Sequence, residues 1–162
     1  MDEIVARALA KWPGVPDVFG WLSLDRRGQW LLRKPAGEGR EAIGNAALRE
    51  FIARNYSCDP LGRWFFQNGP QRVFVRLAYT PLVVRTRDSA FVDHCGRDFE
   101  SRAAMLDEEG SLLLQGRDSV ALLDDRDLAA YAEVFGGAIE ALPRVDSRQV
   151  PHRFGFIPDP QP

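Results

Sequence analysis

The densest group of chemically reactive side chains in this sequence is the run Asp93-His94-Cys95, and a second histidine, His152, follows much later. A cysteine acts as a nucleophile when a histidine ring faces its sulfur and takes its proton. Neighbouring residues of a strand point to opposite faces, so the base for Cys95 would have to come from elsewhere in the fold. His152 could supply it, although no sequence pattern places it beside Cys95. One hypothesis is therefore a small thiol- or histidine-dependent hydrolase. The structural alternative is a histidine at a strand end beside a small buried thiol.

A metal site would have to combine Cys58, His94, Cys95 and His152, which are the cysteines and histidines of the chain. Structural zinc sites normally contain closely spaced ligand pairs such as Cys-x-x-Cys, and the sequence has none. It also lacks a Gly-rich phosphate loop, a His-Glu-x-x-His motif and a Gly-x-Ser-x-Gly motif. We therefore expect neither a metal nor a cofactor.

A binding surface is predicted on the strand expected over Gln71–Ala78. Alternation places Val73, Val75 and Leu77 on one face of this strand and Arg72, Phe74 and Arg76 on the other. Guanidinium groups beside an aromatic ring bind anionic, planar or peptidic ligands through forked hydrogen bonds and stacking. With residues of the adjoining hairpin and strands, the predicted site comprises Arg63, Asn68, Arg72, Phe74, Arg76 and Arg85. The alternative is a solvated face on which the arginines pair with acidic side chains.

The elements that position these residues are introduced by one phrase that occurs three times. Each copy has an Asp, two variable residues, a Gly, one polar residue and three large apolar residues: Asp25–Leu32, Asp59–Phe66 and Asp107–Leu114. Asp at the start of a β-turn hydrogen-bonds the backbone two residues on, and Gly adopts a positive φ easily. The phrase therefore predicts a turn that begins a strand. Because the first and third copies both precede a capped amphipathic helix, they also predict a duplicated β-β-(insert)-α unit, with chance recurrence of a common turn as the alternative.

Hydrophobic periodicity predicts the remaining elements. Strands are expected at Phe19–Leu24, Gln29–Arg33, Arg63–Gln67, Gln71–Ala78, Leu82–Arg87, Phe91–Gly96, Arg102–Leu106, Ser111–Gln115 and Ser119–Leu123. Helices are expected over residues 2–12, from an Asn45 cap to about Tyr56, and from an Asp124 cap to a stop at Gly136-Gly137. Asn68-Gly69 predicts a hairpin, so that the strands from Arg63 to Arg87 form a β-meander. The stretch Lys34–Arg40 is expected to be a loop.

Length and composition indicate a globular protein. The 162 residues fit a single domain or two docked sub-domains, about 18–88 and 90–142, followed by an irregular Pro-rich C-terminal tail. The content of 45% hydrophobic and 27% charged residues is typical of folded proteins, and no apolar run approaches the ~18 residues that cross a bilayer. The acidic start at Asp2-Glu3 and the presence of only two cysteines predict a cytoplasmic location without a disulfide framework.

The charge of the chain limits the classes of partner. A net charge of −2 argues against a general binder of nucleic acid or of acidic membranes. All basic residues except Lys11 and Lys34 are arginines. This bias is explained either by many forked contacts with anions or by the codon usage of a GC-rich genome.

Several segments carry a resemblance to known sequences: Lys11–Pro16, Gly20–Asp25, Arg54–Tyr56, Gly62–Val75, Leu106–Gly110 and Leu122–Leu128. Together they resemble a family of small proteobacterial proteins known only as a domain of unknown function, over about residues 11–130. The most specific block is Trp64–Arg72. The first turn, the helix after it and the second Gly–aromatic strand are also similar to another uncharacterised bacterial family. That family has repeated α+β motifs and has been discussed as a signalling module. The two resemblances imply a fold but no catalytic residues.

The expected fold is therefore α+β, with antiparallel β-hairpins and a β-meander, two main helices on one side and an additional N-terminal helix. The expected function is that of a non-catalytic cytoplasmic binding module, with a regulatory or signalling role, for an anionic small molecule, a peptide or a protein. The hydrolase is the alternative. Nucleic acid and membrane are not expected as partners, and a homo-oligomer formed through a sheet edge is a third hypothesis.

Overall fold

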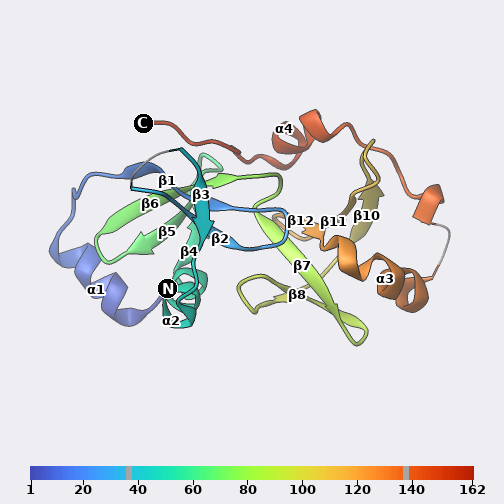
Figure 1. Cartoon of the computed structure of the whole chain (residues 1–162), viewed down its shortest axis with the longest axis horizontal. Helices are drawn as coiled ribbons and strands as arrows, with labels where there is room; N and C mark the ends of the chain where they lie inside the picture. Colours follow the sequence, from blue (N-terminus) through green and yellow to red (C-terminus); the bar gives the residue numbers. More distant parts are fainter. Residues whose placement is uncertain (36–37, 137–138) are drawn as a thin grey trace. The chain divides into compact units, whose positions relative to one another are not determined.

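The computed structural model describes residues 1–35, 38–136 and 139–162, and the chain forms two compact units (Figure 1). The first unit contains Met1–Asp25, Gln29–Ala78 and Phe156–Pro162. The second contains Arg26–Gly28 and Tyr79–Gly155. Each unit is built on a six-stranded sheet. Gly37 of the predicted loop and Gly137 of the predicted helix stop lie outside the described residues.

The sheet of the first unit has the strand order β3-β2-β1-β6-β5-β4. Its strands are β1 (Val18–Leu24), β2 (Trp30–Arg33), β3 (Arg40–Ala42), β4 (Tyr56–Cys58), β5 (Trp64–Asn68) and β6 (Gln71–Leu77). Neighbouring strands are antiparallel except for the central pair, β1 and β6, which is parallel.

The sheet of the second unit has the order β10-β11-β12-β7-β8-β9. Its strands are β7 (Leu82–Arg87), β8 (Ala90–Asp93), β9 (Asp98–Phe99), β10 (Ala103–Leu106), β11 (Leu112–Gln115) and β12 (Val120–Leu123). Again only the central pair, β7 and β12, is parallel. β7 is therefore not the third strand of a meander with β5 and β6, as the sequence pattern suggested. Both edges of β6 are already paired, with β5 and β1, so that β7 has no free edge there.

The two sheets have the same topology, which confirms the predicted internal duplication. Each consists of two three-stranded meanders, and the last strand of the second meander runs parallel to the first strand of the first. The repeated unit thus contains six strands and is larger than the β-β-(insert)-α unit expected. The turn at Asp59 after β4 corresponds to the turn at Asp107 after β10, so the equivalent copies of the phrase are the second and third.

Four helices accompany the sheets in the part of the chain that the structure describes: α1 (Glu3–Lys11), α2 (Ala46–Arg54), α3 (Leu128–Phe135) and α4 (Val150–Phe154). Asn45 caps α2 as predicted, because its side chain accepts a hydrogen bond of 3.0 Å from the Leu48 N–H. Asp2 does not cap α1; its carboxylate instead accepts hydrogen bonds from Arg54 and Asn55. None of these helices combines the length and the hydropathy required to cross a membrane.

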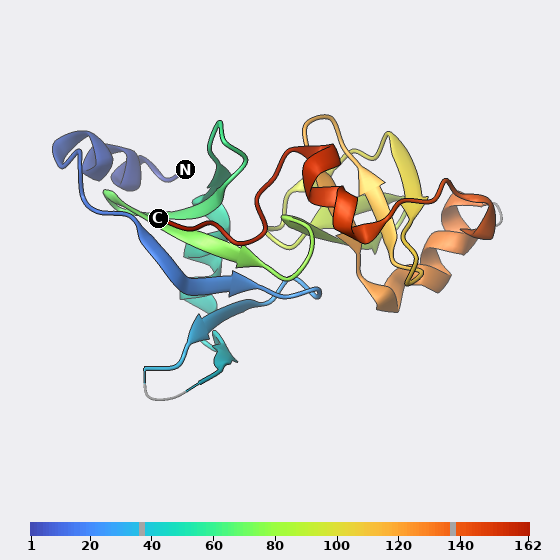
Figure 2. The ribbon, with the colours of Figure 1, turned by 90° about the horizontal axis from the view of Figure 1, so that it is seen from above.

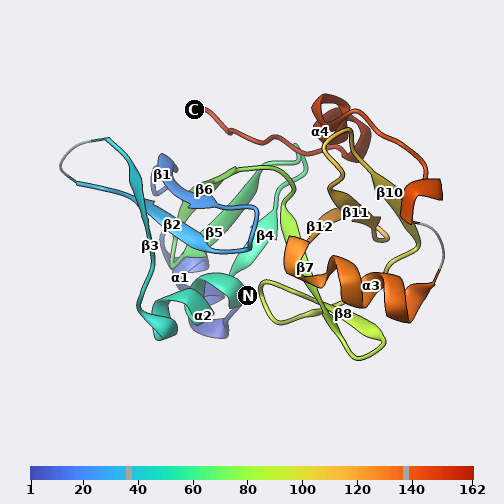
Figure 3. The same ribbon diagram turned by 45° about the vertical axis from the view of Figure 1, so that its right-hand side comes forward.

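α2 and α3 do not occupy equivalent places in the repeat. α2 connects β3 to β4, whereas α3 follows β12 and lies alongside β7 and β8 (Figure 3). The ring of Phe51 in α2 packs edge-on against Phe66, and Ile52 is buried. In α3, Tyr131 and Phe135 stack with Phe91 of β8. Each sheet therefore has its own helix and its own core.

The edges of both sheets are short. The edge strands are β3 and β4 in the first unit and β9 and β10 in the second. Backbone hydrogen bonds with Pro143 and Val145 also cover part of β10, at Leu106. Short or covered edges reduce the opportunity for pairing with another chain.

Candidate functional site

The run Asp93-His94-Cys95 forms a fourth copy of the Asp-x-x-Gly turn. The Asp93 carboxylate accepts hydrogen bonds of 2.9 Å from the backbone N–H groups of Cys95 and Arg97, and Gly96 has a φ of 80°. Asp107 accepts the corresponding bonds from Glu109 and Ser111. Asp93 and Gly96 are recognisable in the sequence, but the three large apolar residues that mark the other copies are missing after Arg97. The cluster is therefore explained as a turn between β8 and β9.

The chemistry of this turn does not favour nucleophilic catalysis. Burial, with the nearby charge of Asp93, raises the pKa of Cys95 to about 12, so the side chain is a neutral thiol near pH 7. His94 Nδ1 accepts a hydrogen bond of 3.3 Å from the Val83 N–H. His152 lies in α4 and is exposed. The geometry of the turn therefore gives no support to the alternative of a thiol hydrolase.

The residues considered for a metal site are also dispersed. Cys58 belongs to the first unit, and His94, Cys95 and His152 belong to the second. Across residues 1–35, 38–136 and 139–162, no three His, Cys, Asp or Glu side chains are grouped as they would be around a metal ion.

Of the six residues predicted to form the binding surface, four lie on the same face of one sheet and two lie elsewhere. Arg63, Arg72, Phe74 and Arg76 come together on one face of the first sheet. Asn68 ends β5 at the hairpin, where alternation directs its side chain to the opposite face. Arg85 was expected on a strand beside the one that carries Arg72 and Arg76, but it lies in β7 of the second sheet. There its guanidinium holds Asp127 through two hydrogen bonds of 2.7 Å.

The strand register identifies two further arginines on the same face of the first sheet. Arg76 lies opposite Ser23 of β1, Ser23 lies opposite Leu31 of β2, and alternation then places Arg33 on this face. Arg33 lies directly opposite Arg40 of β3. We call the surface formed by Arg33, Arg40, Arg63, Arg72 and Arg76 the arginine face. No sequence pattern marked Arg40, which was expected at the end of the loop Lys34–Arg40.

Aromatic rings lie beneath two of these guanidinium groups. Arg63 is 4.6 Å above the ring centre of Phe74, and Arg72 is 4.8 Å above that of Phe65. Phe74 also stacks on Phe19, with 4.7 Å between ring centres. Phe74 was expected to be exposed but is buried, because the Arg63 guanidinium and the Phe19 ring cover it. Trp21, two residues before Ser23 in β1, remains 48% exposed.

The arginine face carries more positive than negative charge. Asp59 pairs with Arg63 at 2.8 Å, and Asp159 pairs with Arg76 at 3.6 Å. Within the described residues, Arg33, Arg40 and Arg72 form no ion pair. Arg40 instead donates to the carbonyl oxygens of Gly20 and Trp21, at 3.2 and 3.3 Å.

The environment of Arg40 reflects this excess of positive charge. Burial lowers the pKa of Arg40, and the charges of Arg76 and Arg33 lower it further, against the opposing effect of Asp159. Like charges directly opposite each other on two strands destabilise a sheet. The pair of Arg33 and Arg40 therefore represents a cost that a bound anion would relieve.

Two buried polar groups lie on the same side of the first sheet. The Ser23 hydroxyl and Gln67 Oε1 have no hydrogen-bond partner within the described part of the chain. Ser23 is opposite Arg76, and Gln67 is opposite Arg72. Buried polar groups are nearly always satisfied in folded proteins, so these two exceptions beside a charged surface require an explanation.

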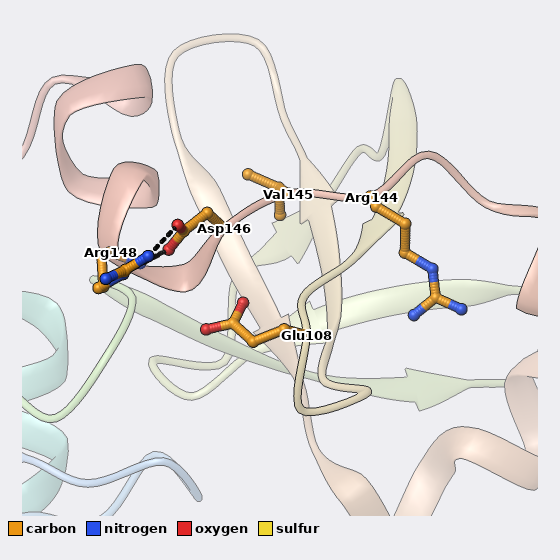
Figure 4. Close-up of a pocket in the computed structure, with 5 residues that line it drawn as sticks. All are labelled: Glu108, Arg144, Val145, Asp146 and Arg148. Carbon is orange, nitrogen blue, oxygen red and sulfur yellow. Dashed lines mark hydrogen bonds and ion pairs between the residues drawn. The ribbon is translucent and has the colours of Figure 1, made fainter.

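The second unit contains cavities, and several of the charged groups that line them are paired with one another. One cavity of about 570 Å³ is lined by Glu108, Arg144, Val145, Asp146 and Arg148 (Figure 4). Arg148 binds Asp146 through two hydrogen bonds, and Glu108 accepts from the backbone and hydroxyl of Ser147. The guanidinium of Arg144 points away from these groups (Figure 4). In another cavity, of about 420 Å³, Arg27 pairs with Asp125 at 3.5 Å. The arginine face is therefore the stronger candidate for binding an anion.

Comparisons with known proteins identify a family and a fold. Residues 1–161 match the model of the DUF2944 family, whose description reads "Protein of unknown function (DUF2946)". No curated protein matches the chain. Two solved structures of DUF1285 family proteins have a similar fold. The protein from Silicibacter pomeroyi DSS-3 has a TM-score of 0.52 and 15% identity, over 82% of this chain and 84% of its own. The protein from Shewanella baltica OS155 has a TM-score of 0.50 and 14% identity, over 71% of this chain and 92% of its own.

Proposed function

The chain belongs to the DUF2944 family, and we propose that this member is a non-catalytic binding module whose arginine face holds an anionic partner. The observation that carries the proposal is the gathering of five guanidinium groups on one side of the first sheet, where two carboxylates pair with them within the described residues. The excess charge is available to a ligand.

The chemistry of the surface suits an anion with planar groups. Guanidinium forks match carboxylate and phosphate oxygens through paired hydrogen bonds. Arg72 is fixed over the ring of Phe65, so less freedom is lost when it binds a ligand. The exposed ring of Trp21 offers a surface for stacking.

A regulatory or signalling role in the cytoplasm is part of this proposal. The cysteines are free thiols, and Cys58 is exposed, which suits a reducing compartment. The raised pKa of Cys95 supports a binding function over a thiol-dependent reaction.

The test uses two probes, inorganic pyrophosphate and an octamer of glutamate, titrated into the full chain by calorimetry. We expect at least one to bind, with an affinity that falls as salt is added. The double variant Arg72→Glu/Arg76→Glu should abolish this binding. If neither probe binds, or if binding survives the double variant, the proposal fails.

A matched control separates the effect of position from the effect of net charge. Arg7→Glu/Lys11→Glu makes the same change of charge on α1, where both side chains are exposed. We expect this variant to bind the probes nearly as well as the natural chain. Thermal melting of both variants verifies that each remains folded.

A further inference from the structure

The segment Phe156–Pro162 lies across the first sheet, on the side opposite α2 (Figures 1 and 2). Its backbone pairs with the sheet where β5 begins and β6 ends, and it bends at Pro158 and Asp159. The Ile157 N–H donates to the Gly62 carbonyl at 2.9 Å, and the Leu77 N–H donates to the Pro158 carbonyl at 2.7 Å. Ile157 also forms a parallel bridge with Arg63.

The segment has buried apolar side chains and one acidic side chain. Phe156 and Pro160 are buried, whereas Ile157 is 39% exposed. The Asp159 carboxylate lies 3.6 Å from Arg76, and about half of each of these side chains is exposed. The negative charge of Asp159 also raises the pKa of Arg40, against the effect of burial. An exposed ion pair of this kind contributes little to stability and can be replaced by a competing carboxylate.

We propose that the arginine face is a docking surface for an acidic peptide of the type apolar-Pro-acidic-Pro, and that Ile157–Pro160 is its intramolecular occupant. The inference rests on the proposed function and names the class of partner. A peptide of the same type from a partner protein displaces the segment and occupies its position.

The backbone contacts favour a peptide over a small anion. Gly62 offers a carbonyl and Leu77 an N–H, and the backbone of the segment forms a hydrogen bond with each of them. A small anion makes use of guanidinium groups but not of a carbonyl oxygen. The proline rings fix the φ angles of Pro158 and Pro160, so the peptide loses less conformational entropy when it docks.

Within the described residues, three arginines of the face form no ion pair, so a partner peptide can bind more tightly than the intramolecular segment by pairing with them. The segment presents one carboxylate, at Asp159, whereas Arg33, Arg40 and Arg72 make no ion pair in the described part of the chain. A peptide with additional acidic residues beside the same core engages more guanidinium groups. The partner is therefore expected to be more acidic than Phe156–Pro162.

The experiment uses a fluorescent synthetic peptide that copies residues 155–161 and carries two added glutamates. Its anisotropy is measured against the full chain and against the variant Asp159→Ala. We expect Asp159→Ala to bind the peptide about two- to fivefold more tightly, because one exposed ion pair of the competing segment has been removed. Asp17→Ala removes an exposed carboxylate elsewhere in the first unit and should leave the affinity unchanged.

A scrambled peptide of identical composition separates this inference from the proposed function. If both peptides bind equally, or if Asp159→Ala leaves the affinity unchanged, the face responds to charge alone and the peptide inference is overturned, while the anion-binding function stands. If pyrophosphate and octaglutamate also fail to bind, the proposed function fails with it. Preferential binding of the ordered peptide, lost in Arg72→Glu/Arg76→Glu, supports both.

Discussion

Each Asp-x-x-Gly turn depends on the backbone conformation of a single residue. Gly28, Gly62, Gly96 and Gly110 all have φ between 77° and 81°, in the left-handed region. Other L-residues reach this region only at a cost, because the Cβ atom approaches the neighbouring carbonyl oxygen. The glycines are thus required by the turns and not by close packing alone.

We expect Gly96→Ala and Gly110→Ala each to lower the free energy of unfolding by about 1 kcal/mol. At both positions an added Cβ meets no atom within 4 Å, so the effect reports backbone strain. Gly28→Ala should cost more, because its Cβ would lie 2.6 Å from the His94 Cβ. Urea unfolding provides the measurement. Gly44→Ala is the control, since Gly44 has open space and no positive φ, and equal losses at all four positions would contradict the interpretation.

Asp124 is predicted to make the stability of the protein depend on acid pH. Hydrogen bonds from the Arg126 side chain lower its pKa from 3.8 to about 2, and the carboxylate is fully buried. Because the folded pKa lies below the unfolded one, the ionised group stabilises the fold above about pH 4. This contribution declines as the pH falls from 4 toward 2.

The measurement is the free energy of unfolding in urea at pH 5, 4 and 3. Asp124→Asn should be less stable than the natural chain at pH 5, and the difference should shrink at lower pH. Asp17→Asn, at an exposed position, should follow the natural chain throughout. A difference for Asp124→Asn that is constant with pH would rule out the titration.

At the scale of elements, one carboxylate joins α3 to the strand beside it. Asp127, just before α3, accepts two hydrogen bonds from Arg85 and two more from the backbone and hydroxyl of Thr86 in β7. Arg85 was predicted to bind a ligand, but its guanidinium is engaged in this contact. Its role in the second unit is to hold the start of α3 on the sheet.

A double-mutant cycle with Arg85→Gln and Asp127→Asn tests this connection. We expect each single variant to lose about 1–3 kcal/mol of unfolding free energy, because the remaining partner is left unsatisfied. The double variant should lose less than the sum of the two. Strict additivity in urea unfolding would show that the two side chains stabilise the unit independently.

The elements that were missed in the sequence carry weak local signals. β3 is a three-residue strand with the polar sequence Arg40-Glu41-Ala42 and is formed through its pairing with β2. β4 follows α2 so closely that Tyr56 appeared to be the end of the helix. α4 was expected to be irregular, although Pro151 in its first turn is a typical helix start. Asp146 caps the 3₁₀ turn Ser147–Gln149 that leads into α4. Strongly patterned strands such as β6 were predicted correctly.

At the scale of the whole molecule, the parallel pairing of β1 with β6 and of β7 with β12 decided which parts of the prediction failed. Local patterns identify hairpins, because a hairpin pairs neighbours in the sequence. The central pairs join strands that are far apart in the chain, and no turn signal marks them. For this reason the sequence indicated Arg72, Phe74 and Arg76 on one face, but it could not bring Arg33 and Arg40 beside them.

Because each unit has its own core, we expect a core substitution to destabilise mainly the unit that contains it. Leu22→Ala removes a fully buried side chain from the first unit, and Leu113→Ala does so in the second. Each should cost about 2–5 kcal/mol. Hydrogen exchange followed by NMR should accelerate mainly in the strands of the altered unit. Equal acceleration in both sheets would show that the units unfold as one.

The order of synthesis has a consequence for the segment that covers the arginine face. Phe156–Pro162 completes the first unit but is translated after all of Tyr79–Gly155. At 5–20 residues per second, this interval lasts on the order of ten seconds. During that time the first sheet can fold on the ribosome without this segment. If the proposed peptide docking is correct, a partner present at translation would meet no intramolecular competitor, and its affinity would be highest before the segment is made.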